Sequence, residues 1–183
     1  MRGAMLALVL LTGRASASEA QRVVEPRAVA GNTPRGDALL RQAMLDGHNA
    51  ARAAVSEAPL VWDGHLADDA GAYADVLART RRFQHAEQPQ GPGREGENLF
   101  TGTRGAYSYR EMVDLWVAER RDYVPGITPR FSRTGNPGDV AHYTQIVWRN
   151  TTRIGCGLAS NATDDYLVCR YAPAGNVIGE RAF

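Results

Sequence analysis

The chain contains no lysine, and all 21 of its basic residues are arginine. We interpret this as codon bias in a GC-rich genome, which points to a bacterial source. The 20 acidic residues nearly balance the arginines, so the formal net charge is only +1. A charge this small gives no long-range field that would gather nucleic acid or an anionic membrane surface. We therefore expect no nucleic-acid partner.

Long apolar runs are also absent. The apolar run at residues 4–11 is much shorter than the roughly 20 residues that cross a bilayer as a helix. It follows Arg2 and precedes an Ala-x-Ala cleavage pattern at residues 15–17, so residues 1–17 are predicted to be a secretory signal peptide. An uncleaved anchor or a misassigned start is the alternative, because Arg14 lies unusually close to the cleavage site. The mature protein is expected to be secreted or periplasmic, without stable membrane insertion.

Charge, proline and glycine are mixed over residues 18–36 without a sustained apolar period, which predicts a flexible linker. One folded domain is predicted over residues 37–183, since 44% hydrophobic content suffices for a core. Capping residues indicate three helices, which begin near Asp37, near Asp63 and at Ser108. Their buried faces are predicted from apolar residues spaced three or four apart, among them Leu40, Met44, Ala51, Leu66, Ala70, Leu77, Met112, Leu115 and Trp116.

The segment 83–103 lacks periodicity and is rich in glycine, proline and glutamine, which predicts a long loop. This loop contains His85 and Glu97. Further along, Glu119 follows Trp116 by three residues and so falls on the buried face of the third helix. A buried carboxylate must find a partner or change its protonation, which makes Glu119 a candidate for a site.

A strand is predicted over residues 142–149, where β-branched and aromatic residues gather after a loop rich in glycine and proline. On a period of two, His142 shares a face with Ile146 and Trp148. A titratable ring therefore stands at the end of a packed row. His142 is either a satisfied structural histidine or part of a site.

The only two cysteines, Cys156 and Cys169, lie in two further predicted strands, at residues 154–160 and 166–171. If residues 161–164 form the loop of a hairpin, the two cysteines face each other in register, close enough for a disulfide. An exported protein is expected to oxidise such a pair. A metal site at the cysteines is the weaker alternative, because neither CxxC spacing nor a histidine pair accompanies them.

Four short strings occur in the order HNAAR (48–52), GENL (96–99), HYTQIVWRNT (142–151) and YLVCRYAPAGNV (166–177). Together they resemble the four signatures of the CAP superfamily, whose SCP domain occurs in cysteine-rich secretory proteins, antigen 5 proteins and plant pathogenesis-related proteins. The resemblance covers about residues 40–180. The chain differs from many eukaryotic relatives in having one pair of cysteines and no cysteine-rich extension, so it is most similar to a bacterial-type single-domain member.

The resemblance implies an α+β fold, a three-layer α-β-α sandwich with a central, largely antiparallel sheet. It also implies a surface cleft with two histidines and two acidic residues. By position in the motifs, that tetrad corresponds to His85, Glu97, Glu119 and His142 in this chain. His48 and Asn49 belong to a signature that forms scaffold around the first helix, so the tetrad does not include them.

Two imidazoles and two carboxylates suit zinc or another borderline divalent metal, with His85 and His142 as the predicted ligands. General acid/base chemistry by Glu97 or Glu119 is the alternative, although the chain has no HExxH or GxSxG motif and no free cysteine nucleophile is expected. A third possibility is a satisfied hydrogen-bonded network that only shapes the cleft. No organic cofactor is expected.

Three functions remain open after these considerations. The resemblance favours a secreted, monomeric binding module for a small hydrophobic ligand or peptide, such as a lipid or a sterol. A metal-dependent or acid/base hydrolase acting on peptides or envelope material is supported by the tetrad alone. An extracellular protein–protein interaction module is the third. Substrate turnover that disappears in Glu97→Ala would select the hydrolase, and a co-purifying lipid would select the binding module.

Overall fold

The computed structural model describes residues 23–25, 27, 31–89, 91 and 93–183. The predicted signal peptide lies outside the described residues, as does part of the predicted linker. In chain order the elements are β1 (Val23–Glu25), α1 (Asp37–Ala53), β2 (Val61–Trp62), α2 (Gly64–Thr80), β3 (Gly96–Thr103), α3 (Tyr109–Ala118), the 3₁₀ helices η1 (Glu119–Asp122) and η2 (Pro137–Val140), α4 (Ala141–Ile146), β4 (Arg153–Ser160) and β5 (Asp164–Ala172).

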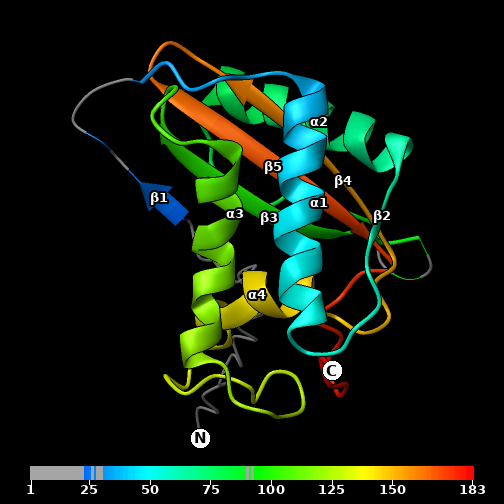
Figure 1. Cartoon of the computed structure of the whole chain (residues 1–183). Helices are drawn as coiled ribbons and strands as arrows, with labels where there is room; N and C mark the ends of the chain where they lie inside the picture. The colour runs from blue at the N-terminus through cyan, green and yellow to red at the C-terminus, as the bar shows by residue number, and fades with distance from the viewer. Residues whose placement is uncertain (1–22, 26, 28–30, 90, 92) are drawn as a thin grey trace, which may run out of the picture.

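The described strands form one sheet in the order β1-β3-β5-β4-β2. Its three long central strands pair antiparallel, and the short strands β1 and β2 add parallel pairs at the two edges. Helix α2 covers one face, and α1, α3 and α4 cover the other (Figure 1). The predicted α-β-α sandwich with a largely antiparallel sheet is confirmed.

The two faces of the sheet carry cores of different kinds. The larger core, under α1, α3 and α4, contains the fully buried rings of Trp116, Trp148 and Tyr171. Under α2 the core is built from alanines against the sheet, and the main chains approach closely. A Cβ on Gly157 of β4 would lie 2.4 Å from the Cα of Gly71, so only glycine fits there. The aromatic side is the one that borders His48 and His142.

The predicted helix starts are confirmed for two of the three helices. Asp63 caps α2 by accepting hydrogen bonds from the N–H groups of His65 and Leu66. Ser108 and Glu111 form the expected capping box of α3. The first helix differs, because Asp37 is its first helical residue and Gly36 holds the cap position without a side-chain bond.

The prediction of a strand over residues 142–149 is wrong, because residues 141–146 form the short helix α4. The carboxylate of Glu119 accepts hydrogen bonds from the main-chain N–H groups of His142 and Tyr143, at 3.0 and 3.1 Å. Those first-turn donors have no partner within a helix, so a distant side chain stabilises the helix start. This tertiary contact outweighs the weak strand preference of the β-branched residues.

The segment 83–103 is also only partly a loop, since Gly96–Thr103 forms the central strand β3. Almost every residue of β3 is buried, because helices cover both faces of the sheet at this point. Such a strand shows no alternation of polar and apolar residues, which is the pattern that would have identified it. Glu97 therefore lies on a strand, while His85 remains in a loop.

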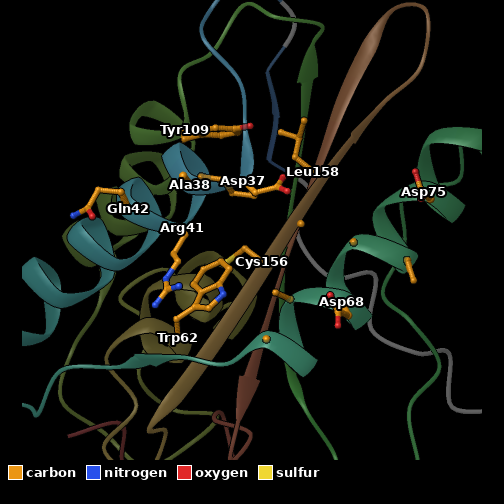
Figure 2. A pocket seen from close by; sticks show the side chains of 16 residues that line it. Asp37, Ala38, Arg41, Gln42, Trp62, Asp68, Asp75, Tyr109, Cys156 and Leu158 are labelled. Carbon is orange, nitrogen blue, oxygen red and sulfur yellow. The ribbon is translucent and has the colours of Figure 1, made fainter.

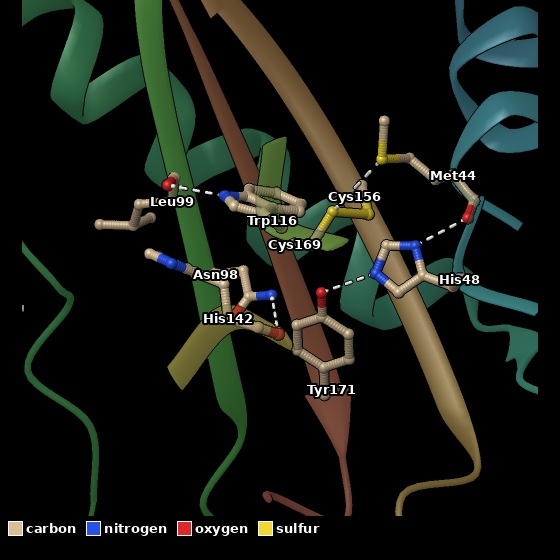
Figure 3. The surroundings of a disulfide bond; sticks show 9 residues. All are labelled: Met44, His48, Asn98, Leu99, Trp116, His142, Cys156, Cys169 and Tyr171. Atoms are coloured by element: carbon tan, nitrogen blue, oxygen red, sulfur yellow. Dashed lines mark hydrogen bonds between the residues drawn. A yellow bond between two sulfur atoms is a disulfide. The ribbon is translucent and has the colours of Figure 1, made fainter. Parts of the chain in front are cut away.

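The predicted disulfide is confirmed. Cys156 on β4 faces Cys169 on β5 in the expected register, and their Sγ atoms are bonded at 2.03 Å. Ser160 faces Asp165, as the predicted hairpin loop requires. Figure 3 shows the disulfide beside Met44 and the ring of His48, within the larger core. The bond ties together two central strands at the level of the core histidine.

The segment predicted as a linker includes residues that contact the domain. β1 runs parallel to β3, with Val23 opposite Phe100. Arg27 donates hydrogen bonds to the carbonyl of Ala106 at 2.7 Å and to Glu111 at 2.9 Å. In the described part of the chain, no helix is long and apolar enough to cross a membrane.

Candidate functional site

A cavity of about 430 Å³ opens where the 83–95 loop, β3, α4 and the segment after β5 meet. His85, Glu97 and His142 line it, together with Asn98 and Gln145. Glu119 is not part of the wall, because it lies behind His142. The structure thus brings three of the four predicted residues to one cavity and places the fourth in contact with one of them.

His142 is held by Glu119 from the end of α3. The Nδ1 atom of His142 lies 2.6 Å from Oε1 of Glu119, and both side chains are largely buried. The imidazole stacks on the ring of Trp116, with 5.9 Å between ring centroids and an interplanar angle of 14°. Asn98 on β3 donates a hydrogen bond to the carbonyl of His142 (Figure 3). These contacts fix both the position and the orientation of the ring.

His85 forms a second pair of the same kind with Glu97. Its Nδ1 atom lies 2.5 Å from Oε1 of Glu97, and the N–H of Ala86 donates to the same oxygen at 3.1 Å. Side-chain exposure is 34% for His85 and 5% for Glu97, so the loop histidine is the more accessible of the two. Glu97 belongs to β3, where the ladder with β5 holds its main chain.

Both pairs leave the same ring nitrogen available. A carboxylate can only accept, so each Nδ1 carries the proton that it donates to its glutamate. In a neutral imidazole, Nε2 then presents a lone pair. The structure shows no protein hydrogen-bond partner for Nε2 of His85 or of His142 among the described residues. This is the arrangement found around metal-ligating histidines, in which a second group fixes the tautomer.

The described residues do not provide a complete set of protein ligands for a metal ion. In the described part of the chain, no group of three or more His, Cys, Asp or Glu side chains is placed to hold a metal ion. Two histidines could therefore supply only part of a coordination sphere, and water or a bound molecule would have to complete it.

Arg170 is a site residue that the sequence analysis missed. It lies opposite Glu97 in the β3–β5 register, and its Nε atom is 3.0 Å from Oε2 of Glu97, as an ion pair without hydrogen-bond geometry. A second ion pair, at 2.9 Å, joins Arg170 to Glu95. A signal was present in the sequence, because an arginine amid the apolar residues of a predicted strand needs a buried anion.

Tyr73 on α2 was also missed. Its ring lies under the guanidinium of Arg170 at 5.5 Å, and its hydroxyl donates to the carbonyl of Gln84, beside His85. Burial, reinforced by the charge of Glu97, raises the pKa of the Tyr73 phenol to about 12. The phenol therefore stays protonated as a donor that holds the histidine loop to α2.

His48 lies apart from the cavity, in the core. Its Nδ1 donates to the carbonyl of Met44 at 2.7 Å, and its Nε2 accepts from the hydroxyl of Tyr171 at 2.8 Å (Figure 3). Complete burial lowers the pKa of His48 to about 4. Both ring nitrogens are used, as expected for the scaffold role that the resemblance implied.

Comparison with known proteins agrees with this architecture. The model of the cysteine-rich secretory protein family, named CAP, matches residues 45–171. A pathogenesis-related protein of PR-1 type from Sambucus nigra is 42% identical over 78% of this chain and 81% of its own length. Pathogenesis-related protein 1C from Nicotiana tabacum is 39% identical over 78% of this chain and 80% of its own length.

Solved structures show the same fold at low identity. A crystal structure of NaASP2 with Zn²⁺ is 24% identical and superposes with a TM-score of 0.64, covering 83% of this chain and 90% of the other. The structure of BmVAL-1 is 20% identical with a TM-score of 0.65, covering 85% and 86%. From the matching family model and these relatives, the chain belongs to the cysteine-rich secretory protein (CAP) family.

Proposed function

We propose that the chain is a secreted binding protein whose cavity takes a small ligand, and that His85 and His142 hold a divalent metal there, with zinc preferred. The observation that carries the proposal is the pair of imidazoles that line one cavity, each held through Nδ1 by a glutamate, so that Nε2 is available. Nitrogen ligands of this kind suit zinc. Both proposals concern the same cavity.

Glu97 and Glu119 act as supporting groups in this proposal. Each fixes the tautomer of its histidine and raises the basicity of the ligating nitrogen. Because two histidines leave coordination positions open, water or an atom of the bound ligand would complete the tetrahedron. The family neighbour NaASP2, whose crystal structure was solved with Zn²⁺, supports the choice of metal.

The cavity also has apolar lining that suits the apolar part of a small ligand. Pro129, Phe131, Pro137 and Ile178 contribute to it. A molecule with one polar end and an apolar body would use both the histidines and this lining, which fits a lipid, a sterol or a peptide. Apolar walls with a few placed polar groups are typical of small-molecule sites.

Secretion is proposed on independent grounds. The Cys156–Cys169 disulfide persists best in an oxidising compartment outside the cytosol. Together with the cleavage pattern at residues 15–17 and the family assignment, it favours an exported protein.

A hydrolase finds less support, because three of the four oxygens of the two glutamates accept hydrogen bonds and the fourth, Oε2 of Glu97, is buried in an ion pair with Arg170. Those of Glu97 contact His85, the N–H of Ala86 and Arg170. Those of Glu119 contact the ring of His142 and two main-chain N–H groups. A general base needs an oxygen that can reach a substrate proton.

Calorimetric titration with zinc chloride at neutral pH tests the metal proposal. The wild type should give saturable heat, and the double variant His85→Ala/His142→Ala should give none. His65→Ala is the matched control, because His65 is an exposed histidine at the start of α2, away from the cavity, and its loss should leave the isotherm unchanged. Affinity should fall at acid pH, since imidazole must be neutral to ligate. Equal binding by the double variant would overturn the proposal.

Native mass spectrometry of exported protein tests the ligand proposal separately. A co-purifying lipid or sterol that disappears when Phe131 is replaced by aspartate would support occupancy of this cavity. An apo-mass only, with no shift on adding fatty acids, sterols or short peptides, would contradict it. The same spectrum reports the oligomeric state.

A further inference from the structure

Strand β4 is covered along its outer edge for only part of its length. β2 pairs with Arg153 and Ile154, and the chain then leaves the sheet at Asp63 to enter α2. Over residues 155–160, no strand of the described chain lies on this edge. The sheet therefore ends there in an open strand edge.

The register shows which main-chain groups face that edge. The N–H of Val61 donates to the carbonyl of Thr152, and the N–H of Asp63 donates to that of Ile154, at 3.0 and 2.8 Å. The main-chain groups of successive residues in a strand point to opposite edges. The N–H and C=O of Cys156 and Leu158 therefore face the same edge as the carbonyls of Thr152 and Ile154. In the described part of the chain, these four groups make no hydrogen bond outside the β-ladders, and the register directs them away from β5.

The open edge lies at the base of a groove. A hollow of about 860 Å³ runs between α1 and α2, with Cys156, Gly157 and Leu158 between them. Figure 2 shows β4 passing diagonally between the two helices, with Trp62 at one end and Tyr109 at the other. Cys156 is only 3% exposed, and unpaired polar groups at such depth call for a partner.

Small residues on α2 keep the groove open. Ala67, Gly71 and Ala72 face it from this helix. A Cβ on Gly71 would meet no atom within 4 Å, so a side chain at this position would project into free space. A larger side chain at Gly71 would therefore enter the groove, which can be blocked by this single substitution.

The walls of the groove carry a surplus of acid. Asp37 on α1 and Asp68 and Asp75 on α2 contribute carboxylates, and Arg41 is the one basic residue among the described part of the lining. The guanidinium of Arg41 already lies over the ring of Trp62, at 5.9 Å. This charge distribution is complementary to an incoming chain with cationic side chains.

We propose that the open edge of β4 binds an extended, arginine- or lysine-bearing peptide segment of another protein. The segment pairs with β4 as an added strand, past the point where β2 ends. The main-chain groups of Cys156 and Leu158 form the new ladder, and the aspartates of α1 and α2 receive the cationic side chains. Among the residues that the structure describes, the groove shares none of its lining with the histidine cavity, so this binding is separate from the ligand function proposed above.

Amide hydrogen exchange of the full exported chain gives a direct test. The probe is a synthetic peptide of alternating arginine and valine, about ten residues long, which spans the edge with a margin at roughly 3.4 Å per residue. Addition of this peptide should slow hydrogen exchange at the amides of Cys156 and Leu158, and the peptide should bind saturably. Neither a glutamate–valine peptide of the same length nor an arginine–valine peptide with N-methylated amides should bind or slow this exchange.

Substitutions at the edge separate main-chain pairing from packing. Leu158→Pro removes an edge donor without breaking the ladder to β5, and it should weaken the peptide about tenfold. Leu158→Ala also removes the leucine side chain but keeps the N–H, so this variant should bind the peptide far better than Leu158→Pro does. Gly71→Leu should block the groove, and it should fold well because glycine is unfavourable inside a helix.

The charge contribution has its own control. Asp68→Asn/Asp75→Asn should weaken the arginine peptide several-fold and reduce its salt dependence. Asp69→Asn changes the adjacent residue of α2, which is not in the groove lining, and should bind as the wild type does. Protection that appears at the histidine cavity, equal binding of the glutamate peptide, or pairing of β4 with a second copy of the chain would each overturn the proposal.

Discussion

The core histidine and the two cavity histidines differ in how many ring nitrogens the protein uses. His48 donates through one nitrogen and accepts through the other, deep in the core. His85 and His142 are each held by a glutamate through Nδ1 and border a cavity. Burial alone does not separate them, because His142 is also largely buried. The free nitrogen, and not exposure, marks the residue that can act on a ligand.

Replacing the core histidine should have the largest effect on stability. His48→Ala removes a fully buried ring and leaves the Met44 carbonyl and the Tyr171 hydroxyl without partners. We expect a loss of about 3–5 kcal/mol in the free energy of unfolding. His85→Ala is the matched change at a half-exposed histidine and should cost below about 1 kcal/mol. Urea unfolding of the two variants measures both losses. Equal losses would contradict the distinction between the core histidine and the cavity histidines.

Acid should destabilise the protein through the same core residue. The pKa of His48 in the folded protein is about 4, below the ordinary value of 6.5, so between these pH values the unfolded chain binds a proton that the folded chain does not. The contribution of His48 to the free energy of unfolding is therefore fully present above pH 6.5 and falls by about 3 kcal/mol as the pH approaches 4. His48→Gln cannot titrate and should show a flatter profile. Parallel profiles for wild type and variant would contradict this account.

Removing the disulfide should affect the core while sparing the cavity. The Sγ of Cys169 lies 3.8 Å from the sulfur of Met44, whose carbonyl accepts from His48. On the chain-entropy account, Cys156→Ala/Cys169→Ala should lower the free energy of unfolding by about 3 kcal/mol. Zinc binding by the folded variant should stay within about twofold, since neither cysteine lines the histidine cavity. Thermal unfolding and calorimetry measure the two effects, and two free thiols in denatured, unreduced wild type would contradict the bond.

The sequence predicted contacts that depend on strand register better than those that depend on distant groups. The pairing of Cys156 with Cys169 followed from counting along a hairpin. The helix at His142 did not follow from local residues, because the glutamate that caps it lies 23 positions earlier in the chain. The strand at Glu97 was hidden for a different reason, since burial on both faces removes the alternating pattern.

In the candidate site, too, some residues could be predicted from the sequence and others depended on distant groups. The motif resemblance identified its histidines and glutamates, and the structure puts each glutamate in contact with one histidine. Arg170 was missed although its motif had been noted, because its partner is visible only once β3 is known to be a strand beside β5. The need of Arg170 for a buried anion can be read from its own segment, but the identity of that anion cannot, because β3 was predicted as a loop.

Glu119 gives the smallest and most specific test of the comparison. Glu119→Gln preserves the shape of the side chain but removes one of the acceptors that serve the His142 ring and the first N–H groups of α4. We expect a stability loss of about 1 kcal/mol, and a drop of about 10–100-fold in zinc affinity, because the ring loses the group that fixes its tautomer. Glu57→Gln serves as the control, since Glu57 pairs with Arg149 away from the cavity. Zinc calorimetry with urea unfolding distinguishes the roles: lost stability with unchanged zinc affinity would make Glu119 a helix cap alone, and His142 would then belong with His48.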